Sequence, residues 1–205
     1  MKLSNIYKTA KHPQAGFTLI ELMISIVVGL LLLSTVIGIF IAMIRSDSDN
    51  LKSIRLNQQL RATMSLIARD LRRAGYNGGA IADVMTAAPN PFQSLAITTN
   101  CATYDYDKDR DSTDDGNSES FGFRLNSGAI ESRENGEGCT GTTNWDNVTD
   151  DDLIEITSFT TSDSPVTTGG ITIHEIAITL TGRLINDHNV IRTITETVEV
   201  RNADY

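Results

Sequence analysis

The chain has 205 residues, of which 40% are hydrophobic, and its 17 Lys and Arg against 26 Asp and Glu give a net charge of −9. This length leaves room for one domain with an appendage. The acidic balance, together with only 4 Pro among the residues, excludes a basic nucleic-acid binder and a Pro-rich disordered or collagen-like chain. Two Cys and three His leave little material for a metal enzyme.

Charge and hydrophobicity are distributed unevenly along the chain. Residues 1–16 carry three Lys and no acid, whereas 7 basic and 22 acidic side chains give residues 76–205 a net charge of −15. We therefore expect four segments: a short basic N-terminal segment (1–16), an apolar half (17–44) and an amphipathic half (45–75) of a helix, and an acidic head (76–205).

The apolar half contains 23 consecutive residues without a charge, from Leu22 to Ile44. As a helix, this run covers about 35 Å and can span a bilayer. A domain of this size rarely encloses so long an apolar helix, so the sequence predicts a membrane span rather than a core helix. Because Lys residues precede the span and acidic sequence follows it, the N-terminus is expected in the cytoplasm and the head outside.

One carboxylate interrupts the start of the apolar run. Glu21 lies four residues after Phe17, where an ionised side chain costs on the order of 3 kcal/mol in a membrane. The run is also longer than the apolar region of a secretory signal peptide, and no small-residue cleavage site follows it. Glu21 therefore requires either a cationic partner or a position that lets it reach the lipid headgroups.

The sequence at this point resembles a known export signal. The stretch Gly16-Phe17-Thr18-Leu19-Ile20-Glu21 follows a basic leader and precedes the apolar run. It resembles the class III signal of type IV prepilins and of the pseudopilins of type II secretion. The resemblance implies that prepilin peptidase cuts between Gly16 and Phe17, removes the 1–16 leader and methylates the new amine of Phe17. It also implies that Glu21 pairs with the Phe17 amine of a neighbouring subunit, because two opposite charges relieve each other's desolvation.

The helix pattern continues beyond the membrane span. No proline occurs between residues 17 and 75, and Gly75 follows a basic turn, which predicts one helix from about residue 17 to residue 74. The apolar positions return to one face, while basic and amide side chains fill the rest. These apolar positions are Leu51, Ile54, Leu60, Met64, Ile67 and Leu71. A two-stranded coiled coil is disfavoured, because Asn57 and Gln58 occupy its seam.

The head has the alternating, β-branched runs of strands, separated by Gly, Asn, Asp and Ser. A turn-rich tetrad, Asn186 to Asn189, predicts an antiparallel hairpin between the last two runs, and Ile176, Ile178 and Leu180 would share its buried face. The expected strands are 94–99, 120–126, 129–133, 153–160, 171–184 and 190–201. The predicted fold class is α+β, with a long N-terminal helix packed on an antiparallel β-sheet head. The resemblance to prepilins implies that this fold is type IV pilin-like.

Cys101 and Cys139 are the two cysteines of the chain, and both lie in the exported segment, where thiols oxidise. We expect a disulfide that stabilises the head by roughly 3–4 kcal/mol. Free or intermolecular thiols are the alternative.

An acidic run lies between the cysteines. Asp105, Asp107, Asp109 and Asp111 alternate with other residues, and Asp114, Asp115 and Glu119 follow. Such oxygen ligands suit Ca²⁺, so the first four are candidate calcium ligands. The run departs from an EF-hand, because Arg110 stands where that motif requires Gly. A solvated acidic loop is the alternative, and no other cofactor is expected.

Motifs C-terminal to the signal resemble those of one group of pilins. The stretches 70–76 and 121–125, the acidic run after Cys101, Cys139 before Trp145, and a C-terminal hairpin ending at Asn202 resemble the PilW group of minor pilins and the related pseudopilin J. This implies a minor pilin that primes type IV pilus assembly, in a minor pilin complex at the pilus tip.

The same resemblance implies the partners and the location. The expected partners are prepilin peptidase, the inner-membrane assembly platform, and other minor and major pilins. The expected location is the bacterial inner membrane, with a periplasmic head, and afterwards the pilus. The alternatives are a type II secretion pseudopilin and, more remotely, an adhesion or DNA-uptake pilin. We expect no enzyme, because the sequence has no nucleophile elbow, metalloprotease helix or phosphate loop, and no nucleic-acid partner, because the head is acidic.

Overall fold

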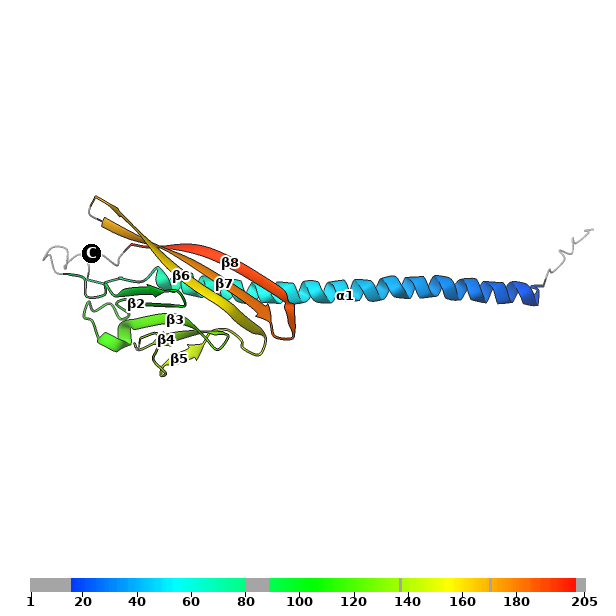
Figure 1. Cartoon of the computed structure of the whole chain (residues 1–205), viewed down its shortest axis with the longest axis horizontal. Coiled ribbons are helices and arrows are strands. Elements are labelled where there is room, and N and C mark those ends of the chain that lie inside the picture. Colours follow the sequence, from blue (N-terminus) through cyan, green and yellow to red (C-terminus); the bar gives the residue numbers. More distant parts are fainter. Residues whose placement is uncertain (1–15, 80–88, 137, 170, 202–205) are drawn as a thin grey trace, which may run out of the picture. The chain divides into compact units, whose positions relative to one another are not determined.

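The computed structural model describes residues 16–79, 89–136, 138–169 and 171–201. Two units make up the chain, Met1–Ser48 and Asp49–Tyr205, and each is described by itself below. The elements in chain order (Figure 1) are α1 (Leu19–Leu71), β1 (Leu95–Thr98), β2 (Cys101–Asp105), the 3₁₀ helix η1 (Gly116–Glu119), β3 (Ser120–Asn126), β4 (Ala129–Glu134), β5 (Trp145–Asn147), β6 (Ile154–Thr168), β7 (Ile171–Leu184) and β8 (Asp187–Val200).

The described part of the first unit is helical from Leu19 onward, and every side chain from Gly16 to Ser48 is exposed. This part of α1 is long and apolar enough to cross a membrane. No described residue covers it, and such an exposed apolar surface is typical of a segment that lies in a bilayer or packs against other proteins.

Two antiparallel sheets form the second unit. The first has the strand order β1-β2-β3-β4-β5 and the second has the order β6-β7-β8, and Figure 1 shows them as two separate groups of strands. Backbone hydrogen bonds join the sheets: the Ile156 amide donates to the Gly128 carbonyl over 2.7 Å, and the Thr161 amide donates to the Thr99 carbonyl over 3.1 Å. The two sheets therefore share one core.

The C-terminal part of α1 supplies one wall of this core. Its buried residues recur every three or four positions and are Leu56, Leu60, Thr63, Met64, Ile67, Ala68 and Leu71. The apolar ones pack with side chains of both sheets, so most of the helix stripe expected from the sequence is confirmed. Leu51 and Ile54, however, are exposed. The end of the helix is tied to the first sheet, because the Tyr104 hydroxyl donates to Asp70 over 3.1 Å.

Strand β7 shows why the second sheet can approach the helix closely. Ile176, Ile178 and Leu180 are fully buried, as their alternation predicts. Gly182 is the next residue on this face, and a Cβ there would lie 3.0 Å from Leu60 Cδ2. The absence of a side chain at Gly182 is therefore what lets Leu60 of α1 pack against the backbone of the strand.

The structure differs from the sequence expectations in several places. Helix α1 ends at Leu71, and residues 72–75 form turns. Strands β2 and β5 were not expected, and the head has two sheets instead of one. Strand β6 continues to Thr168 through Pro165; Pro is tolerated there because β6 lies at the edge of its sheet. The hairpin turn is at Ile185 and Asn186, so β8 begins inside the tetrad that the sequence assigned to the turn.

Candidate functional site

The start of α1 contains the residues of the expected processing signal. Gly16, Phe17 and Thr18 precede the helix and have no regular secondary structure. Phe17 is 85% exposed, and beyond its two chain neighbours no described residue lies within 4 Å of the position that a Cβ on Gly16 would take. The bond between Gly16 and Phe17 therefore lies in an open, non-helical stretch, which is the form that a peptidase can bind.

Thr18 caps the start of the helix at the backbone amide of Glu21. The Glu21 amide donates a hydrogen bond of 3.3 Å to Thr18 Oγ1, so Thr18 satisfies one of the free amides of the first turn. Thr18 followed three residues later by Glu21 is the sequence pattern of a capping box. This capping role was not among the expectations from the sequence, although the Thr-x-x-Glu spacing indicates it.

The carboxylate of Glu21 also lies in the first turn, where the helix dipole favours a negative charge. Glu21 is absent from the ion pairs formed within the described residues. Its backbone carbonyl accepts a hydrogen bond of 2.7 Å from Ser25 Oγ. The carboxylate is thus exposed and available for a cation from outside the chain.

Polar side chains within the apolar half are satisfied by the helix itself. Ser34 Oγ donates to the Leu31 carbonyl over 2.8 Å, and Thr35 Oγ1 donates to the Leu32 carbonyl over 2.7 Å. Such back-bonding satisfies hydroxyl groups that find no water in lipid. These residues are therefore compatible with a membrane span.

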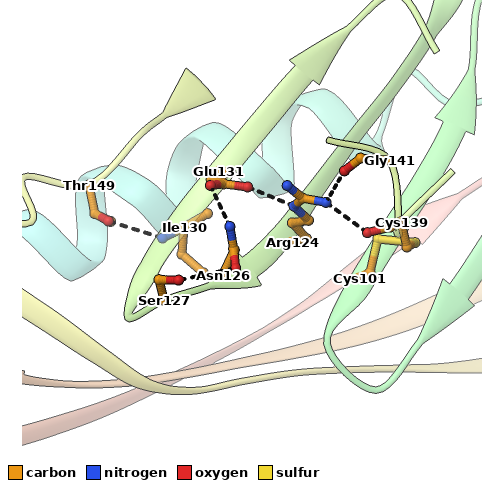
Figure 2. A network of polar contacts seen from close by, with 9 residues as sticks. All are labelled: Cys101, Arg124, Asn126, Ser127, Ile130, Glu131, Cys139, Gly141 and Thr149. Atoms are coloured by element: carbon orange, nitrogen blue, oxygen red, sulfur yellow. Dashed lines mark hydrogen bonds and ion pairs between the residues drawn. A yellow bond between two sulfur atoms is a disulfide. The ribbon is translucent and has the colours of Figure 1, made fainter. Parts of the chain in front are cut away.

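Cys101 and Cys139 form a disulfide with a Cα–Cα distance of 6.1 Å. Cys101 begins β2, and Cys139 belongs to the segment between β4 and β5. Figure 2 shows the polar contacts around this bond. Both cysteines are thus disulfide-bonded, and neither is a free thiol that could act as a nucleophile.

Arg124 of β3 binds the segment that contains Cys139. Its Nη1 donates to the carbonyls of Cys139 and Gly141 over 2.9 and 2.6 Å, and its Nε pairs with Glu131 over 2.6 Å (Figure 2). The guanidinium also lies 4.2 Å from the centre of the Trp145 ring. The disulfide and Arg124 therefore fix the same segment at adjacent points.

Backbone amides bind the two buried carboxylates of the acidic run. Asp107 and Glu119 are 1% and 2% exposed. Oδ2 of Asp107 accepts hydrogen bonds from the amides of Gly78 and Ser112 over 2.8 and 3.0 Å, and its Oδ1 accepts one from the Arg110 amide. Glu119 accepts from the amides of Lys108 and Asp115 over 2.7 and 3.0 Å. Backbone donors thus compensate both buried carboxylates.

The expected calcium ligands are only partly brought together. Asp107, Asp109 and Glu119 place carboxylate oxygens within 4.8 Å of one another, and so do Asp109, Asp111 and Asp115. Asp105 belongs to neither group. Glu119 and Asp115 lie in the same acidic run but were not among the four candidates. The oxygens of these groups could hold a divalent cation.

Asp105 lies beside the loop, in a different environment. Burial raises the pKa of its carboxyl, and hydrogen bonds with Ser120 and Ser94 oppose that change. The neighbouring Tyr106 stacks on Phe121 with ring centres 4.0 Å apart, and burial raises its pKa to about 12. Tyr106 thus belongs to the core of the head, and Asp105 lies half-buried at its edge.

Comparison with known proteins identifies the class of the chain. Residues 49–200 match the family described as prepilin peptidase-dependent protein B. The chain belongs to this family. Residues 11–37 match the prokaryotic N-terminal methylation motif, which covers Gly16, Phe17 and Glu21. This prepilin peptidase-dependent protein is therefore pilin-like, and the expected resemblance to type IV pilins is confirmed. Its apolar helix and prepilin signal indicate anchoring in a membrane.

One solved structure and the curated proteins complete the comparison. The fold is similar to that of a type IV-like pilin from Thermus thermophilus, with 14% identity and a TM-score of 0.46, over 73% of this chain and 98% of that chain. No curated protein matches the sequence.

Proposed function

We propose that this member of the prepilin peptidase-dependent protein B family is a minor pilin that primes type IV pilus assembly in a complex at the pilus tip. One observation carries the proposal: every described side chain of the apolar half is exposed. Such a helix needs a bilayer before assembly and the helices of other subunits afterwards. The protein then acts by helix packing and charge pairing, without catalysis.

Processing supplies the charge that Glu21 needs. Cleavage after Gly16 creates a cationic amine at Phe17, which prepilin peptidase then methylates. In the assembled filament, Glu21 of one subunit pairs with this amine on a neighbouring subunit. Each charge alone is costly in an apolar environment, whereas the pair is hydrogen-bonded and neutral overall. The pairing therefore fixes the axial register of the entering subunit.

The distribution of charge along the chain supports one orientation of the protein in the membrane. The Lys-rich leader stays in the cytoplasm, and the acidic head lies in the periplasm until the subunit enters a filament. The partners in this scheme are prepilin peptidase, the inner-membrane assembly platform, and other minor and major pilins.

Three variants separate charge pairing from helix capping. Glu21→Ala removes the whole carboxylate side chain and Glu21→Gln removes only its charge, while both keep the backbone amide that Thr18 caps. Thr18→Ala removes the cap but keeps the charge. We expect Glu21→Ala and Glu21→Gln to reduce the amount of this protein in sheared filaments at least tenfold. Thr18→Ala should retain most of it, and all three should reach the membrane at the wild-type level.

The same strains test the class of filament. Loss of surface pili on deletion of the gene supports the priming role, and a small amount of the protein relative to the major pilin supports the tip. A strain that keeps normal pili but fails to secrete folded proteins would instead identify a type II secretion pseudopilin. Equal amounts of the Glu21→Gln and wild-type proteins in filaments would refute the charge-pairing mechanism.

A further inference from the structure

The part of α1 in the second unit has one face that neither sheet covers. Its helical residues are exposed and follow one another at intervals of one to four: Leu51, Ile54, Arg55, Gln58, Arg61, Ala62, Ser65 and Arg69. At about 100° per residue they fall within an arc of about 120°. Arg72 and Arg73, also exposed, follow in the turn after the helix ends at Leu71. We call this set the arginine face.

The charges on the arginine face have one sign. It carries five arginines and no Asp or Glu. Arg72 pairs with Glu196 over 3.0 Å, and Arg73 lies over the Tyr106 ring. Within the described residues, Arg55, Arg61 and Arg69 take part in no ion pair with a carboxylate.

Helix stability does not explain the whole face. Arginines near a helix C-terminus interact favourably with the dipole, which accounts for those at positions 69 to 73. Arg55 and Arg61 lie several turns earlier, where the dipole gives no such benefit. The dipole therefore does not account for the positive charge at these two positions.

The shape of the surface suits a second helix. Small or uncharged side chains, Gln58, Ala62 and Ser65, run along the middle of the arginine face. Hollows border it on both sides: one is lined by Arg55, Gln58, Gln59, Ala62 and Leu153, and another is lined by Arg61, Met64, Ser65, Ile194, Thr195 and Glu196. Small residues between larger ones let a second helix approach closely and place its side chains in the flanking grooves.

We propose that the arginine face docks the acidic helix of a different pilin-class subunit, an inference that rests on the proposed function. Charge complementarity selects this occupant, because a carboxylate can pair with each guanidinium that forms no ion pair, including that of Arg61, whose Nε donates to Asn57 Oδ1 over 2.6 Å. A second copy of this chain would place arginines against arginines, and such like-charge contacts act against a wrong partner. The face thus admits an unlike neighbour and rejects a copy of itself, which suits a subunit that occurs once in a complex.

Site-specific photo-crosslinking in cells tests the partner. A photoreactive phenylalanine analogue replaces Ser65, in the middle of the arginine face, in the full-length chain. The control position is Thr160, which is exposed on β6. We expect an adduct from position 65 only, and peptide mapping should place it on an acidic helical segment of another protein that carries the N-terminal methylation motif. An adduct with a second copy of this chain, with lipid or with nucleic acid would overturn the inference, and so would the absence of any adduct.

Charge reversal separates electrostatic docking from general proximity. The triple variant Arg55→Glu, Arg61→Glu and Arg69→Glu should reduce the heterologous adduct at least tenfold, whereas Lys at the same positions should retain most of it. A matched control reverses the exposed charges of Lys108 and Arg192 instead and should leave the adduct unchanged. If the Glu variant crosslinks like the wild type while the protein is found in filaments, the docking inference fails and the proposed function stands. If the protein is absent from filaments altogether, the proposed function fails.

Discussion

Removal of the disulfide gives the most quantitative test of the head. The bond between Cys101 and Cys139 closes a loop with a sequence separation of 38. In the chain-entropy account, a loop of this length stabilises the folded state by about 4 kcal/mol at 25 °C. For a domain of this size, that loss corresponds to a decrease in melting temperature of roughly 8–16 °C.

The perturbation is the double variant Cys101→Ala and Cys139→Ala, which leaves no unpaired thiol. The full-length protein is unfolded with denaturant in detergent micelles. Trp145, which lies over Arg124, is the one tryptophan of the chain, and its fluorescence reports on the segment that the disulfide holds. Far-ultraviolet circular dichroism reports on the strands, and coincident transitions show that the whole head unfolds together.

Wild-type protein treated with reductant is the matched control. We expect the reduced wild type and the double Ala variant to agree within about 1 kcal/mol, both well below the oxidised protein. A difference of less than about 1 kcal/mol between oxidised and reduced protein would refute the reasoning. It would mean that Arg124 and the strand contacts hold this segment equally well without the covalent bond.

Three further outcomes are expected. Gly182→Ala should destabilise the head by about 1–3 kcal/mol in urea unfolding, because the new Cβ would lie 3.0 Å from Leu60 Cδ2; a neutral effect would contradict the close packing. Burial raises the pKa of Asp105, so its ionisation weakens the fold as the pH rises from the unfolded-state value of about 3.9 through the folded-state pKa. Asp105→Asn should therefore melt higher than the wild type at neutral pH and lose this advantage at pH 3, and a pH-independent difference would oppose this explanation. Calcium bound to the groups around Asp109 should raise the melting temperature in millimolar Ca²⁺ relative to chelator, and equal melting temperatures would count against calcium.

The sequence predicted the elements whose pattern is local. The uncharged run of the membrane span, the helix stripe from Leu60 to Leu71, and the alternation at Ile176, Ile178 and Leu180 each repeat with the period of their element. The Gly16-Phe17 junction followed by Glu21 is likewise contiguous. Such features depend on neighbours in the chain, so they could be found without knowing the fold.

The features that were missed depend on contacts between distant residues. Strand β2 continues directly into the acidic run, which hid the alternation of Ala102 and Tyr104. Strand β5 has three residues, too few for any periodic signal. The association of the two sheets depends on hydrogen bonds such as that from Thr161 to Thr99, and the burial of Asp107 depends on amides from distant Gly78 and nearby Ser112. No local pattern encodes these partners.

The central claim is that the protein enters a filament as a processed pilin-class subunit. Intact mass spectrometry of the protein recovered from sheared filaments tests it most directly. The account predicts a chain that begins at Phe17, lacks residues 1–16 and carries one added methyl group and one internal disulfide. A chain that retains residues 1–16 in cells with an active prepilin peptidase would contradict it.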